Sequence, residues 1–138
     1  MIIQGLMEVL QPMTILLVAI GTVVGIIFGA IPGLTATMAI VMFLPVTYSM
    51  AASEGISMLM ALYIGGISGG LISAILLNIP GTPSSVATCF DGKPMANKGE
   101  AGKALGSGVV FSFVGTIIGI GLLVVLSPVL CGLSLIHI

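Results

Sequence analysis

The sequence contains no arginine and only three lysines among its 138 residues. Nucleic-acid phosphates are bound by clustered Lys and Arg side chains, so this composition excludes a nucleic-acid-binding surface. Charged residues of all kinds make up 5% of the chain, whereas soluble domains carry about a quarter. A soluble fold is therefore excluded, and we expect the chain to lie in a lipid bilayer.

Residues that perform chemistry are equally scarce. The single histidine is His137, and Cys89 and Cys131 lie far apart without a Cys-x-x-Cys context, so neither a disulfide framework nor a zinc site is indicated. A nucleophile at Ser84 or Ser85 would need a basic partner, and the apolar segments provide none. We expect no enzyme, no metal site and no bound cofactor.

Long uncharged apolar runs are what the sequence has in abundance. The mean hydropathy is +1.36, and no charged residue occurs between Glu8 and Glu54 or between Glu54 and Asp91. About 20 apolar residues suffice to cross a bilayer. As one straight helix, residues 12–50 would be nearly twice as long as the roughly 30 Å hydrocarbon layer, so the chain must turn, and Pro32-Gly33 is its strongest breaker.

These runs predict an all-α, polytopic integral membrane fold with helices broken at Pro-Gly pairs. The expected helices are Pro12–Ile31, a shorter one over Leu34–Tyr48, then Gly55–Asn78 and Ala104–Val129. Residues 84–90 are too short to span, and form either a half-helix that re-enters the membrane or an interfacial segment. Whether residues 34–48 cross or re-enter stays open.

The segment Asp91–Lys103 is expected to be a loop, and it contains all three lysines. By the positive-inside rule it lies in the cytoplasm. At the other end, no positive residue precedes the first apolar run and no small-residue cleavage site follows it. A cleaved signal peptide is not expected.

Small residues recur at four-residue spacing in the predicted helices. In lipid, such flat faces allow helix backbones to approach and pack, since burial of apolar surface does not drive association there. The expected packing faces comprise Gly21, Gly25 and Gly29; Gly65, Gly69 and Ser73; Gly66, Gly70 and Ala74; and Gly115 and Gly119.

Two short segments look alike, residues 31–37 and 79–85: each places hydroxyl residues just after a Pro-Gly break. In the second, Thr82 is expected to be the N-cap and Pro83 the first helical residue. A helix that begins inside the membrane presents unpaired N–H groups and a positive dipole end, which attract an anion. Paired discontinuous segments of this kind are typical of transporter binding sites.

The candidate substrate-binding residues are therefore Pro32, Gly33, Leu34, Thr35, Asn78, Pro80, Gly81, Thr82, Ser84 and Ser85. We expect the substrate to approach the backbone closely at Gly33 and Gly81. The alternative is that both Pro-Gly pairs are only tight turns between spans. The hydroxyl groups would then be satisfied by neighbouring helix carbonyls.

An ordered set of spaced motifs resembles the opening of one known family. It comprises Gly21-x-x-x-Gly25-x-x-x-Gly29-x-x-Pro32-Gly33-Leu34, Leu44-Pro45, Tyr63-x-Gly65-x-x-x-Gly69-Gly70, Ala74-Ile75-Leu76-Leu77-Asn78-Ile79-Pro80-Gly81 and Asp91-Gly92-Lys93-Pro94-Met95. From about Gly5 to Pro128 the chain resembles TctA-type permeases, the large permease subunits of bacterial tripartite tricarboxylate transporters, so residues 1–128 are expected to be the N-terminal part of the transmembrane permease domain. Residues 129–138 do not continue the pattern and look like a non-native or truncated tail.

The resemblance implies a multi-pass permease of the bacterial inner membrane that imports a tricarboxylate or related carboxylate. Its implied partners are a periplasmic solute-binding protein and a small membrane subunit, and its energy source is an ion gradient, of Na⁺ or H⁺, rather than ATP. Family members are several times longer, so the chain is expected to be the first part of a larger secondary transporter, lacking the second repeat. The alternatives are a small membrane scaffold or assembly protein, or another secondary transporter with broken helices.

Overall fold

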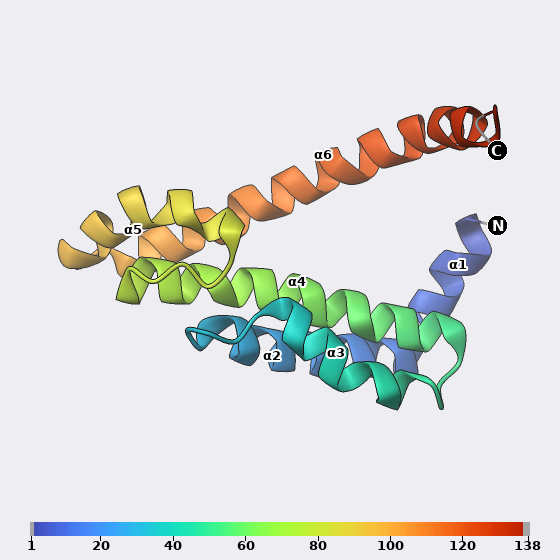
Figure 1. Cartoon of the computed structure of the whole chain (residues 1–138), viewed down its shortest axis with the longest axis horizontal. Coiled ribbons are helices and arrows are strands. Elements are labelled where there is room, and N and C mark those ends of the chain that lie inside the picture. Colours follow the sequence, from blue (N-terminus) through green and yellow to red (C-terminus); the bar gives the residue numbers. More distant parts are fainter. Residues whose placement is uncertain (1, 137–138) are drawn as a thin grey trace. The chain divides into compact units, whose positions relative to one another are not determined.

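The computed structural model describes residues 2–136, of which residues 2–4, 129 and 131–136 are described by their backbone alone. Its elements are α1 (Ile2–Val9), α2 (Pro12–Ala30), α3 (Ala36–Thr47), α4 (Ala52–Leu77), the short 3₁₀ helix η1 (Pro83–Ser85), α5 (Val86–Asn97) and α6 (Ala101–Ile136) (Figure 1). The chain divides into two units, Met1–Leu105 and Gly106–Ile138, and each is described by itself.

The all-helical prediction is confirmed. Helix α2 begins at Pro12, where proline is tolerated because an N–H in the first helical turn would have no partner within the helix. It ends just before Ile31-Pro32-Gly33. Within the part of the chain that the structure describes, three helices are long and apolar enough to cross a membrane, over the residues Pro12–Ala30, Ala52–Leu77 and Ala101–Pro128. Helix α1 was not predicted, because its eight residues are too few to give a clear apolar period.

Helices α2 and α4 pack in parallel through the predicted glycine faces. A Cβ atom at Gly21 would lie 2.8 Å from Met58 O, and one at Gly25 would lie 2.9 Å from the amide nitrogen of Gly66. On the α4 side, Cβ atoms at Gly65 and Gly69 would likewise collide with the α2 backbone. The two backbones are therefore in direct contact, as the small-residue spacing predicted.

Helix α3 runs antiparallel to α4 and lies on its next face. Ala36 is packed against Gly66, where a Cβ would come 2.8 Å from the Ala36 Cα, and at the other end a Cβ at Gly55 would come 3.1 Å from the Thr47 Cβ. The core of this three-helix arrangement is formed by Leu17, Ala39, Met58 and Leu62. Helix α4 is thus covered on two adjacent faces and is the centre of the first unit.

The prediction of a loop over Asp91–Lys103 is wrong for its first half. Residues 91–97 belong to α5, and the connection to α6 is confined to residues 98–100, where Gly99 has a φ of 81°. Gly92 and Pro94 favoured a loop locally, but Gly92 is buried against Ile75 of α4. Packing against α4 has overridden the local preference for a break.

Helix α6 extends three residues before and seven beyond the predicted Ala104–Val129 and contains Pro128. Within the described part of the chain, a Cβ at Gly115 or Gly119 would meet no atom within 4 Å. The packing face expected there stays a prediction. His137 lies outside the described residues.

Candidate functional site

The first Pro-Gly segment forms a tight turn followed by a capped helix. The Leu34 N–H donates to Ile31 O at 3.1 Å, and Gly33 has a φ of 93°, a conformation that glycine adopts without steric cost. Thr35 is the N-cap of α3, and its side-chain oxygen accepts a hydrogen bond from the Met38 N–H at 3.2 Å. The hydroxyl residues after this break therefore stand at a helix N-terminus.

The second Pro-Gly segment turns back along the helix that precedes it. Asn78 ends α4 in the left-handed conformation, with a φ of 60°, and the Ile79 N–H donates back to Ser73 O at 3.4 Å. Gly81 then fits between α2 and α4: a Cβ there would lie 2.8 Å from Gly29 O and from Ser73 Oγ. We call residues 78–82 the return segment.

Thr82 and Pro83 occupy the positions that the sequence predicted for them. Thr82 has the extended conformation of an N-cap, and its N–H donates to Ser85 Oγ at 3.1 Å. The buried Ser85 hydroxyl donates in turn to Thr82 O at 2.8 Å. Thr82 Oγ1 and the exposed Ser84 hydroxyl are 3.0 Å apart and share a hydrogen bond.

The two segments meet in one cavity of about 460 Å³. Its lining comprises Thr35, Ala36, Thr37, Tyr63, Ile67, Gly81, Thr82, Pro83 and Ser84. The first residues of α3 and the first residues of η1 thus face the same space, beside the Gly66–Gly70 part of α4. At about 1.5 Å per residue, Gly66 lies about 21 Å from Ala52 and about 16 Å from Leu77 along α4, which places the cavity well inside the span.

The lining offers neutral hydrogen-bonding groups on an apolar background. Five side chains carry hydroxyl groups: Thr35, Thr37, Tyr63, Thr82 and Ser84. The first amides of α3 add N–H groups that have no partner within the helix. Within the described part of the chain, no charged side chain lines the cavity, and no group of three His, Cys, Asp or Glu residues is placed to hold a metal ion.

Residues 15–136 match the tripartite tricarboxylate transporter TctA family, which is most of the chain. The chain belongs to that family. TctA proteins are transporter subunits and not enzymes, in agreement with the missing catalytic partners. The resemblance drawn from the spaced motifs is therefore confirmed.

A curated relative of this TctA chain is an Agrobacterium vitis protein described as the uncharacterized 52.8 kDa protein in the TAR-I ttuC′ 3′ region. The two are 36% identical over 131 residues, which are 95% of this chain and 26% of the relative. The chain thus spans about a quarter of the length of the relative it matches. No solved structure matches the chain.

The remaining candidate residues of this TctA segment lie outside the cavity. Pro32, Gly33 and Leu34 form the turn between α2 and α3, and a Cβ at Gly33 would meet nothing within 4 Å among the described residues. Asn78 and Pro80 line a second cavity of about 440 Å³, together with Val86, Cys89, Phe90, Lys93 and Pro94.

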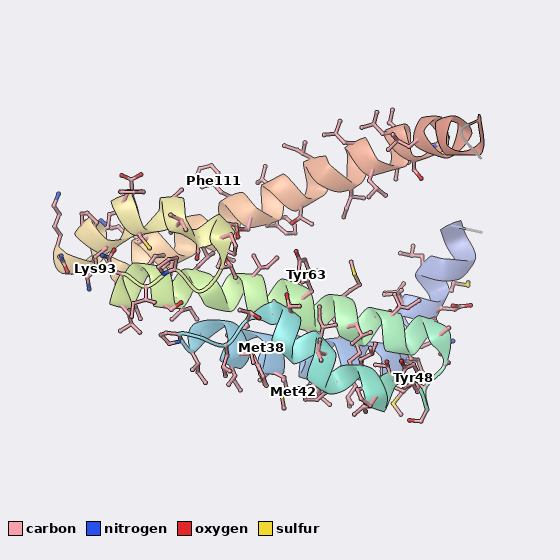
Figure 2. The ribbon with its side chains drawn as sticks, in the orientation of Figure 1. Met38, Met42, Tyr48, Tyr63, Lys93 and Phe111 are labelled. Carbon is pink, nitrogen blue, oxygen red and sulfur yellow. The ribbon has the colours of Figure 1, made fainter. Side chains whose placement is uncertain are left out.

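The lining residues that were not among the predicted candidates are Ala36, Thr37, Tyr63, Ile67 and Pro83. Of these, Tyr63 is the one that carries a phenol. Tyr63 lies on α4 and is 45% exposed (Figure 2). In the apolar run between Gly55 and Leu77, the other polar side chains are all serines. A phenol in such a run combines an apolar ring with a hydrogen-bonding tip. That combination was the available signal, but only the fold brings Tyr63 beside the two helix N-termini.

Proposed function

We propose that this chain forms part of a permease that carries a carboxylate across the bacterial inner membrane, and that the cavity between α3 and η1 belongs to its substrate site. The observation that carries the proposal is the convergence of two helix N-termini on one cavity in the middle of α4. Membership of the TctA family supports the carboxylate as substrate class.

The chemistry of the lining suits an anion held without a cationic side chain. N–H groups at the start of a helix point at a bound anion, and the helix dipole favours negative charge there. Hydroxyls of Thr37, Tyr63 and Ser84 can donate further hydrogen bonds to carboxylate oxygens. Cotransported Na⁺ or H⁺ would offset the substrate charge that neutral donors leave uncompensated.

The chain path supports two re-entrant hairpins with facing tips. Helices α2 and α3 come from the Ala52 end of α4 and turn back at residues 31–35, beside the Gly66–Gly70 region. The return segment and α5 come from the Leu77 end, and their turn at Thr82 also reaches Gly70. Discontinuous helices whose tips meet near the midplane are the usual way in which secondary transporters build a binding site.

Other parts of the proposed assembly lie beyond this chain. We propose that it works with a periplasmic solute-binding protein and a small membrane subunit, as the family name implies for a tripartite system. A scaffold that only assembles through glycine faces is the less supported alternative. The faces of α2 and α4 that would serve such a scaffold are already occupied within this chain.

The test is carboxylate uptake by a longer chain that contains this segment, reconstituted with its partner subunits. Ser84→Ala and Thr37→Val remove one donor each from the cavity and are expected to raise the KM for uptake about tenfold. Ser49→Ala, an exposed hydroxyl beyond the far end of α3, is the matched control and should leave the KM unchanged. Normal kinetics in both cavity variants would show that the Pro-Gly segments are structural turns only.

A further inference from the structure

The C-terminal end of α4 leaves backbone carbonyls without their usual donors. The Leu76 carbonyl would ordinarily accept from the N–H of the residue four positions later, but that residue is Pro80, which has no N–H. Asn78 and Ile79 both direct their N–H groups back to Ser73 O instead. A carbonyl at this place needs a donor from outside the helix.

Lys93 of α5 supplies the missing donor. Its ammonium group donates to Leu76 O at 2.6 Å, across 17 residues of sequence. Figure 2 shows where the Lys93 side chain lies. An ammonium at a helix C-terminus also interacts favourably with the negative end of the helix dipole. One residue earlier, Gly92 is buried against α4, where a Cβ would come 2.7 Å from Ile75 Cγ1. Lys93 and Gly92 together fix α5 to the end of α4.

Between this junction and the cavity, the chain contacts α2 and α4 at two places, where Gly81 lies against Gly29 and Ser73 and where Thr82 lies over Gly70. The return segment contains no helix, and the bond from Ile79 is long at 3.4 Å. The position of Thr82 and Ser84 therefore depends on these contacts and also on where α5 is held along α4.

We propose that Lys93 is a positioning residue for the cavity: its bond to Leu76 O holds η1 at the depth where Thr82 and Ser84 face α3. The proposal rests on the proposed function for its consequence in transport, but its structural content can be tested independently. Lys93 is not among the residues that line the cavity, and its hydrogen bond goes to Leu76 O. Its effect on a carboxylate is exerted through the placement of η1.

The first measurement is hydrogen exchange of the chain in lipid nanodiscs. Lys93→Met is expected to accelerate exchange about tenfold in peptides that contain the amides of Ile79, Thr82 and Ser85, with α2 unchanged. Lys93→Arg should restore slow exchange, and Lys98→Met, at a lysine with an exposed side chain on the neighbouring connection, should behave as wild type. Unchanged exchange in Lys93→Met overturns the proposal. Equal acceleration in α2 also overturns it, because Lys93 would then hold the whole fold.

The second measurement separates this proposal from the proposed function. In a longer transporting chain, Lys93→Met is expected to raise the KM for carboxylate several-fold with little change in the maximal rate, and Lys93→Arg should rescue it. If exchange responds as expected but neither Lys93→Met nor Ser84→Ala alters uptake, the substrate site lies elsewhere while the role of Lys93 in placing η1 stands. If Ser84→Ala alters uptake and Lys93→Met changes neither exchange nor KM, the site stands and the role of Lys93 fails.

Discussion

The side chain of Thr82 lies over the backbone of Gly70. A Cβ atom at Gly70 would come 3.1 Å from Thr82 Cγ2 and 3.2 Å from Thr82 Oγ1. The N-cap of η1 is therefore seated on α4 at a place where a larger residue at position 70 would require the Thr82 side chain to shift. This contact joins the packing of α4 to the geometry of the cavity, because Thr82 both caps η1 and lines the cavity.

Substitutions at the two Pro-Gly glycines should differ in their structural cost. Gly81→Ala brings a methyl group to 2.8 Å from Gly29 O and Ser73 Oγ, so it should lower the free energy of unfolding by about 1–3 kcal/mol or more. Gly33→Ala meets no neighbour but must hold a φ of 93°, which costs about 1–2 kcal/mol. Thermal unfolding of the chain in detergent gives the order.

A loss of less than about 1 kcal/mol for Gly81→Ala would contradict the packing at this position. Substrate was expected to approach the backbone closely at Gly81, but protein atoms already occupy the space around this residue. The close neighbours of Gly81 are protein atoms of α2 and α4, so loss of uptake in Gly81→Ala would not by itself report contact with substrate.

The contact between α2 and α4 predicts a second contrast between glycines. Gly25→Val should separate the two helices and lower the thermal midpoint strongly, because even a Cβ would lie 2.9 Å from the Gly66 nitrogen and 3.0 Å from the Gly65 Cα. Gly115→Val in α6 is the matched control, and it should leave the midpoint of the chain nearly unchanged. Similar losses in both variants would show that α2 and α4 are not held by this contact.

The orientation in the membrane is testable with single cysteines after both native cysteines have been replaced. Asn97→Cys, beside the lysine-bearing connection, should resist an impermeant thiol reagent added outside intact cells, because that connection is expected to be cytoplasmic. Ala51→Cys, at the opposite end of α4, should react rapidly. The reverse labelling pattern would invert the predicted topology.

The phenol of Tyr63 provides the sharpest probe of the cavity. Tyr63→Phe removes one oxygen and keeps the ring, so packing on α4 is preserved while a hydrogen-bond donor is lost. We expect the KM for carboxylate uptake to rise about threefold to tenfold. Tyr48→Phe, at the C-terminal end of α3 and 80% exposed, is the control and should transport normally. Wild-type kinetics in Tyr63→Phe would exclude a role for its hydroxyl group.

Periodicity and breakers predicted the main helices because they reflect local chemistry. Helix α2 ends before Pro32-Gly33, within one residue of the expected position. Helix η1 has Thr82 as its N-cap and Pro83 as its first residue, as expected. These features depend on missing N–H groups and capping side chains, which act within a few residues.

What local patterns could not predict was how the return segment lies along α4. That path depends on Gly81 fitting between Gly29 and Ser73, and on Gly92 packing against Ile75, contacts between residues distant in sequence. The same contacts turned the expected loop at residues 91–97 into helix and brought Tyr63 to the cavity. Side-chain chemistry indicated which residues were suitable for a site, and tertiary packing decided which of them meet.

The backbone contact between α2 and α4 also bears on motion. Where Gly25 faces Gly65 and Gly66 without intervening side chains, the two backbones are in direct contact, and a Cβ added at Gly25 would collide with α4. We therefore expect α2 and α4 to move together as one rigid body in the proposed transport cycle. The conformational change of the proposed transport cycle would then take place at connections that leave this rigid body, among them residues 31–35 and the return segment.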